Sequence, residues 1–197
     1  MAAYRRVGAM AAGIGGAAPA ANTATSLAEQ STAHAVAKAK AAVIGNLVGD
    51  AAAVTSHWVY DQNTLAAHVE KLGGPDKAPF MDPINPYYHV SPGKQSCYGD
   101  QTWALVEAMS NGGDVVDFDK YRSHLTAIMG GDTDYGPLGR VITKEQQPIQ
   151  GPWRHGSMKT FFANQADPAV QMNDKQIDGA CKVAPLVAAC GGDTAKM

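Results

Sequence analysis

The 197-residue chain is predicted to be all-α, and three observations support this. Apolar residues recur at helical spacing in five stretches, most of which end at glycine or proline. No stretch alternates apolar and polar residues as a half-buried strand does. A hydrophobic content of 45% in a chain of this length is sufficient for one domain with a real core.

The longest predicted helix covers residues 33–56. Its apolar residues are separated by three, four or seven positions: Val36, Val43, Leu47, Ala51 and Val54. Ile44 and Val48 widen this apolar face, so we expect the helix to be central to the core. Gly45 and Gly49 weaken the helix but would allow a neighbour to approach closely.

Two further helices are predicted before residue 111. One covers residues 62–72 and stops at Gly73, and the other starts at Asp100, which is a candidate N-cap. Five prolines between residues 75 and 92 exclude a helix or a central strand from the segment that joins the two. We expect that segment to wrap irregularly around the domain.

The last two predicted helices lie in the second half of the chain. One covers residues 118–129, with Asp117 and Asp119 at the end where the helix dipole favours acids. Residues 132–155 are predicted to be irregular because they are rich in Gly, Pro and Gln. The final helix is predicted over residues 178–189, with a kink at Pro185.

The two ends of the chain are unusual. Residues 1–32 are rich in Ala and Gly and contain no acid before Glu29, which suits either an organelle transit peptide or a disordered leader. The domain is therefore expected to cover residues 33–197, and its abrupt end predicts a C-terminally incomplete domain. A cytoplasmic location is expected, or a mitochondrial or other organellar one if the leader is a transit peptide.

Composition also limits the classes of partner. A formal net charge of −2 gives no basic excess, so we expect no nucleic-acid partner. No apolar run approaches the length that spans a bilayer, so we expect no membrane partner. Three cysteines without a CxxC pair favour a reducing compartment over a disulfide framework or structural zinc site.

Asp50 and the pair Asp100 and Thr102 are the main candidates for chemistry. Asp50 lies in an otherwise apolar stretch, so its carboxylate either lines a pocket or accepts hydrogen bonds from a backbone turn. Asp100 and Thr102 bring two hard oxygen groups to one helix start, as Mg²⁺ or Ca²⁺ prefers. Their alternative role is simple helix capping, which spacing alone favours.

Two other residues allow weaker hypotheses. His57 follows the first helix and would act either as an acid–base group or as a local hydrogen-bond partner. Cys97 precedes a possible helix N-terminus that would stabilise a thiolate, which allows a thiol enzyme as an alternative function. The Gly-Gly-Asp-Thr sequences at residues 130–133 and 191–194 are interpreted as polar turns after helices.

Four segments in order resemble the ADP-ribosylglycohydrolase superfamily, and within it the branch of J1 crystallin and selenoprotein J. Residues 45–51 (GNLVGDA) resemble its first Gly-Asp-Ala motif, and residues 57–61 (HWVYD) resemble the continuation in the crystallin branch. Residues 98–105 (YGDQTWAL) stand where the family has its metal-binding Thr-Asp-Asp-Thr. Residues 178–186 (DGACKVAPL) resemble its ADP-ribose segment.

The resemblance implies an orthogonal multi-helix bundle and Mg²⁺-assisted hydrolysis of ADP-ribosyl glycosidic bonds. Asp50 and Asp100 would be the catalytic groups, and Asp100 and Thr102 the surviving metal ligands. The partner would be ADP-ribose or an ADP-ribosylated substrate. It would be bound by the segment that consists of Asp178, Gly179, Ala180, Cys181 and Lys182.

Departures from the family pattern favour an alternative, a non-catalytic crystallin-like structural or ligand-binding protein. Gly99 and Gln101 replace a metal-binding Thr and Asp, and Lys182 replaces an arginine. Residues 132–134 (DTD) spell the family's late metal motif, but they precede the ADP-ribose segment instead of following it. On this reasoning the second half of the metal site is missing from the chain.

Overall fold

The computed structural model describes residues 27–110, 116–171 and 178–190, and its fold is all-α as predicted. The α-helices are α1 (Leu27–Ala53), α2 (Gln62–Lys71), α3 (Cys97–Ser110), α4 (Phe118–Met129), α5 (Gly156–Ala166) and α6 (Val183–Ala189). The 3-10 helices are η1 (Val54–Ser56), η2 (Pro75–Lys77), η3 (Lys144–Gln146) and η4 (Asp178–Lys182). Two short strands, β1 (Tyr88–His89) and β2 (Ile149–Gln150), pair in parallel.

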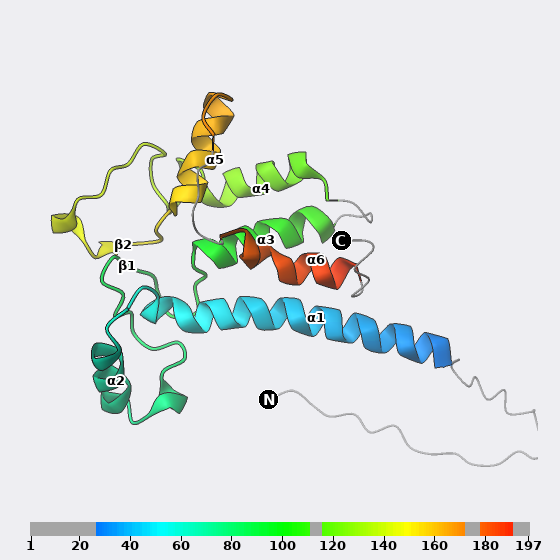
Figure 1. Ribbon diagram of the computed structural model, residues 1–197, viewed down its shortest axis with the longest axis horizontal. Helices are drawn as coiled ribbons and strands as arrows, with labels where there is room; N and C mark the ends of the chain where they lie inside the picture. The colour runs from blue at the N-terminus through cyan, green and yellow to red at the C-terminus, as the bar shows by residue number, and fades with distance from the viewer. Residues whose placement is uncertain (1–26, 111–115, 172–177, 191–197) are drawn as a thin grey trace, which may run out of the picture.

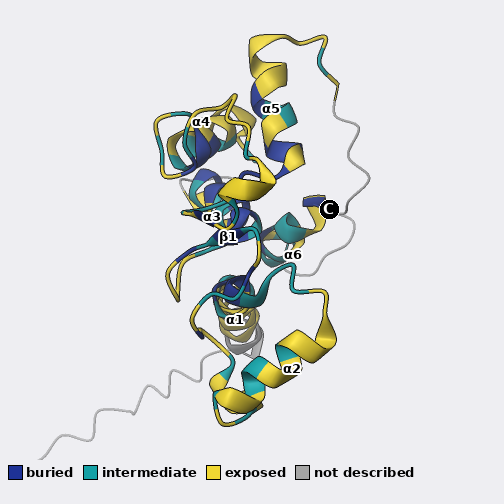
Figure 2. Cartoon of the chain, turned by 90° about the vertical axis from the view of Figure 1, so that its left-hand side faces the viewer, coloured by how far each residue is buried: buried dark blue, intermediate teal, exposed yellow. Residues whose placement is uncertain are grey.

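Helix α3 is at the centre of the packing. It contacts α1 on one side and α4 on the other, and α6 with η4 lies against both α1 and α3 (Figure 1). The buried surface concentrates on α3 and on the facing parts of α4 and α5, whereas α2 has no buried residue (Figure 2). The main core cluster consists of Cys97, Ala104, Leu125, Met129, Tyr135, Met158 and Phe162.

The expectation that the first helix is central to the core is wrong for the part of the chain that the structure describes. Ile44 is 60% exposed and Val48 is 51% exposed, and a Cβ atom at Gly45 or Gly49 would meet nothing within 4 Å. Only the C-terminal end is buried, through Ala51 and then Val54 in η1. The helix also starts at Leu27, within the segment assigned to the leader.

Helix α3 starts three residues earlier than predicted, so Asp100 is not its N-cap. The Ser96 hydroxyl accepts a hydrogen bond of 3.0 Å from the Tyr98 N–H and caps the helix instead. Asp100 therefore lies in the first turn of α3, and its side chain does not cap the helix.

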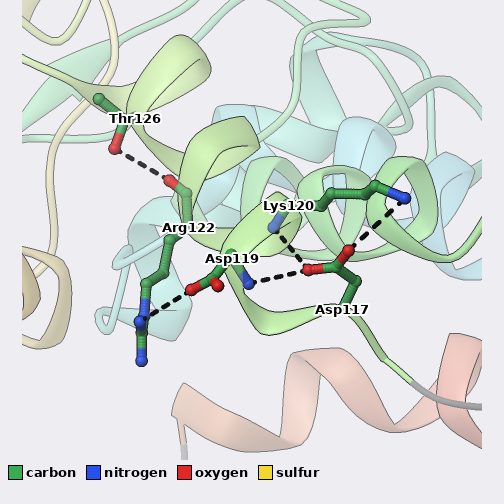
Figure 3. Close-up of polar contacts among 5 residues, drawn as sticks. All are labelled: Asp117, Asp119, Lys120, Arg122 and Thr126. Atoms are coloured by element: carbon green, nitrogen blue, oxygen red, sulfur yellow. Dashed lines mark hydrogen bonds and ion pairs between the residues drawn. The ribbon is translucent and has the colours of Figure 1, made fainter.

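Helix α4 confirms its prediction, and its local signals explain why. Asp117 is the N-cap, and its carboxylate accepts hydrogen bonds from the N–H groups of Asp119 and Lys120 (Figure 3). Arg122 forms an exposed ion pair of 3.2 Å with Asp119 one turn away (Figure 3). Such pairs stabilise a helix locally and do not depend on the rest of the fold.

Helix α5 was not predicted, and the last predicted helix is divided. Met158 and Phe162 are four residues apart and enter the core from one face of α5, a signal too short to be recognised alone. Residues 178–182 form the 3-10 helix η4, and α6 starts only at Val183. Pro185 thus lies in the first turn of α6, where proline is tolerated and no kink is required.

No helix in the described residues is both long and apolar enough to cross a membrane.

Candidate functional site

Asp50 fastens the end of α1 to the start of α3. Its Oδ2 accepts a hydrogen bond of 2.7 Å from the Ser96 N–H, and its Oδ1 accepts one of 2.5 Å from the Ser96 hydroxyl. Ser96 in turn caps α3, so the carboxylate acts as a cap supplied by another helix. This geometry favours the hydrogen-bonding alternative for Asp50, and its assignment as a catalytic group stays a prediction.

Gly99 is buried directly against Asp50. A Cβ atom at this position would collide with the Asp50 carboxylate and with the Gln95 amide oxygen. Glycine is therefore required by the close approach of α1 and α3, and a threonine could not take this place without displacing Asp50. The glycine at residue 99, where the motif that the sequence resembles has threonine, therefore has a packing reason.

Asp100 faces a cavity of about 790 Å³ that lies between the start of α3 and the loop after α4. Its polar lining includes Lys94, Gln95, Asp100, Asp132, Thr133 and Asp134. Ala127 and Ile128 of α4 and residues 150–152 complete much of the wall. The motif that sequence order had excluded, residues 132–134, therefore lies in the same cavity as Asp100.

Burial raises the pKa of Asp100 to about 6. The Tyr135 hydroxyl opposes this shift by donating a hydrogen bond of 2.6 Å to Oδ2, whereas the nearby Asp50 carboxylate raises the pKa further. A carboxyl group with a pKa near 6 can hold or release a proton close to neutral pH. Asp100 is thus suited to move a proton for a ligand in the cavity.

The raised pKa of Asp100 should appear in the pH dependence of stability. An acid whose folded-state pKa lies above its unfolded value destabilises the folded state once it ionises. The contribution of Asp100 to the free energy of unfolding should therefore fall as the pH rises from 3.8 to about 6. Asp100→Asn should remove this contribution and be more stable than wild type at neutral pH by about 1–2 kcal/mol.

Urea unfolding at a series of pH values measures this difference. Asp119→Asn is the matched control, because the Asp119 side chain is 92% exposed and should leave the profile unchanged. An Asp100→Asn profile that is parallel to the wild-type profile between pH 4 and pH 7 would contradict the shifted pKa.

Thr102 and Gln101 point away from the cavity. The Thr102 hydroxyl, fully buried, lies 2.7 Å from the Cys181 carbonyl oxygen and 3.0 Å from that of Tyr98. The buried Gln101 amide donates to the Cys97 carbonyl at 3.1 Å and accepts a hydrogen bond of 2.9 Å from Lys182 Nζ. Side chains two positions apart on an α-helix are rotated by about 200° around the helix axis, so Asp100 and Thr102 do not face one ligand.

The predicted substrate segment forms η4, which packs against α3. Asp178 is buried and accepts a hydrogen bond of 2.6 Å from the Ser157 hydroxyl, while Gly179 and Ala180 are exposed. Cys181 and Lys182 are the residues that bond to Thr102 and Gln101. None of the five residues is among those that line the Asp100 cavity, so their role in binding a substrate stays a prediction.

His57 and Cys97 are both engaged in structural contacts. His57 Nδ1 lies 2.8 Å from the Tyr88 hydroxyl, and burial lowers the pKa of His57. Cys97 is 1% exposed, and burial raises its pKa to about 12. A thiol that is inaccessible and uncharged at neutral pH is a poor nucleophile, so the structure counts against a thiol enzyme that uses Cys97.

The cavity suits Mg²⁺ only when a ligand supplies part of its coordination. Asp100, Asp132 and Asp134 offer the hard oxygen atoms that Mg²⁺ prefers. Within the described ranges, however, no three acidic, histidine or cysteine side chains lie close enough together to hold an ion. Magnesium commonly binds through one or two carboxylates plus ligand phosphate oxygens and water, so these aspartates could hold it only together with a ligand, and the magnesium site stays a prediction.

The fold and the site together define a mostly helical protein with an acidic cavity beside the N-terminus of its central helix. The chain is homologous to two J1 crystallins of Tripedalia cystophora. It is 31% identical to crystallin J1A and 30% identical to crystallin J1B, in each case over 159 residues that make up 79% of this chain and 47% of the relative. The chain thus spans about half the length of these relatives. No protein-family model and no solved structure matches it.

Proposed function

We propose that this chain is part of an ADP-ribosylglycohydrolase-like protein whose Asp100 cavity binds an ADP-ribosyl group together with Mg²⁺. One observation carries the proposal: Asp100 shares a cavity with Asp132, Thr133 and Asp134. Carboxyl and hydroxyl groups from two segments that are 32 residues apart in the sequence therefore line one cavity, which is large enough for a small molecule.

The negative charge of the cavity wall explains why a pyrophosphate ligand would need Mg²⁺ to bind there. The cavity wall carries three carboxyl groups against one lysine, Lys94, so a pyrophosphate would be repelled unless a cation lies between them. When bound, Mg²⁺ would neutralise that repulsion and polarise the oxygens of the ligand. Asp100, kept in place by the Tyr135 hydroxyl, would then accept a proton from a water molecule near the glycosidic bond.

Titration calorimetry with ADP-ribose tests the proposal. We expect binding in the presence of Mg²⁺ and none after chelation, and Asp100→Asn should weaken it by about ten- to hundredfold. Asp119→Asn is the control, since it changes the same charge on an exposed surface. Absence of ADP-ribose binding by the wild-type protein with Mg²⁺ would refute the proposal.

A non-catalytic, crystallin-like protein is the second candidate. The observation that favours it is the hydrogen bond from Lys182 to Gln101, because it engages the amide that stands where the resembled motif has a carboxylate. Incubation with an ADP-ribosylated peptide and Mg²⁺ distinguishes the two. Release of ADP-ribose supports catalysis, whereas binding without release over pH 6–9 supports the second candidate.

A further inference from the structure

Arg154 is a buried cation that meets backbone carbonyl groups at both ends of one loop. The residue is 4% exposed. Its Nη2 donates hydrogen bonds to the carbonyl oxygens of Met129 at 2.8 Å, Gly130 at 3.1 Å and Gly136 at 2.8 Å. Its Nε donates a second bond to Met129 at 3.0 Å, and Nη1 donates to Pro137 at 3.3 Å. All three guanidinium nitrogens are therefore used.

The loop closed by these bonds is the one that carries the acidic wall of the cavity. Met129 and Gly130 are the last residue and the C-cap of α4, so the guanidinium satisfies carbonyl groups that a helix end leaves without partners. A cation there also opposes the negative end of the helix dipole. Gly136 and Pro137 lie at the far end of the loop, so residues 132–135 lie between the two ends that Arg154 contacts.

Two aromatic rings lie beside the Arg154 guanidinium, and one of them belongs to the residue that bonds to Asp100. The Arg154 guanidinium carbon lies 5.6 Å from the Tyr135 ring centre and 5.7 Å from that of Phe162. Tyr135 is the residue whose hydroxyl donates to Asp100. Arg154 thus supports the ring that orients the Asp100 carboxyl group, although Arg154 does not line the cavity itself.

We propose that Arg154 is a positioning residue, whose forked guanidinium pins residues 130–137 so that Asp132, Thr133, Asp134 and Tyr135 form one wall of the ligand cavity. The effect on the ligand rests on the proposed function, whereas the effect on the loop does not. A lysine would keep the charge at the end of α4, but its single ammonium group could not replace all three nitrogens, so the bonds that Nε and Nη1 donate to Met129 and Pro137 would be lost.

Hydrogen–deuterium exchange of Arg154→Lys tests the proposal without any ligand. We expect amide exchange within residues 130–137 to become about tenfold faster, because bonds to a charged group are lost, while exchange in α3 is unchanged. Arg122→Lys is the control, since this arginine lies on α4 (Figure 3) and its side chain is 59% exposed. Unchanged loop exchange, or acceleration spread equally through α4 and α5, would overturn the proposal.

Chemical rescue and ligand affinity complete the test. In Arg154→Ala, added methylguanidinium should restore the slow exchange of residues 130–137, whereas an equal concentration of sodium chloride should not. If methylguanidinium fails to slow this exchange in the folded variant, the proposed role of the guanidinium group is overturned. Arg154→Lys should also weaken Mg²⁺-dependent ADP-ribose binding by about tenfold, and an unchanged affinity would overturn the link to the cavity. If the wild-type protein binds no ADP-ribose, the proposed function fails while the exchange result still decides the role of Arg154.

Discussion

Replacing Asp50 with alanine is expected to lower the free energy of unfolding by about 2–4 kcal/mol. The carboxylate accepts hydrogen bonds from both the N–H and the hydroxyl of Ser96, which is 2% exposed. Alanine would leave both donors buried and unpaired at the start of the central helix. Asp50→Asn should also destabilise the fold, because its NH₂ group would face one of the two donors.

Urea unfolding at constant pH measures this effect. Asp119→Ala removes an exposed carboxylate and should stay within about 0.5 kcal/mol of wild type. The same experiment separates the two roles considered for Asp50. If Asp50 acts only in catalysis, Asp50→Ala will lose activity and keep wild-type stability, which would contradict the capping role described above.

Gly99→Ala is expected to cost about 1–3 kcal/mol of stability, and Gly99→Thr, which introduces the larger residue of the motif that residues 98–105 resemble, should cost more. The new Cβ would collide with Gln95 and with the Asp50 carboxylate. Gln95 can move, but Asp50 cannot retreat without breaking its bonds to Ser96. A threonine at residue 99 should therefore disrupt the start of α3.

Thermal unfolding of matched glycine variants measures this cost. Gly45→Ala is the control, since a Cβ atom there meets nothing within 4 Å and alanine favours a helix by up to about 1 kcal/mol. In an Asp50→Ala background, Gly99→Ala should cost less than it does alone, because the colliding carboxylate is gone. Equal costs in both backgrounds would show that the contact with Asp50 is not the reason for glycine.

The helices were predictable where their signals are local. Helix α4 has an acidic N-cap, an apolar stripe and a glycine stop, all within residues 117–131, and its observed bounds agree with the prediction. Helix α5 has only two core residues four positions apart and no side-chain cap, so its pattern was too weak. The pairing of β1 with β2 joins segments about 60 residues apart in two-residue strands, which no periodicity can reveal.

The sequence drew attention to Asp100 but not to the residues that share its cavity. The sequence singled out Asp50 because a carboxylate in an apolar helix segment is unusual, and Asp100 because it brings a hard oxygen group to a helix start. It missed Tyr135, whose partner Asp100 is 35 residues away in the sequence. It also missed Arg154, whose partners are backbone carbonyl groups. It grouped Thr102 with Asp100 by proximity in the chain, although the helical rotation between them was a usable signal.

The sequence by itself therefore determined the helical class, most helix positions and the acids that needed an explanation, because caps, stops and periodicity act over a few residues. Only the tertiary structure decided what each acid does. Asp50 became a cap because α1 crosses the start of α3, and Asp100 became a cavity residue because residues 132–135 return to face it. These contacts depend on how the helices pack, and packing brings together residues that are far apart in the chain and share no local sequence pattern.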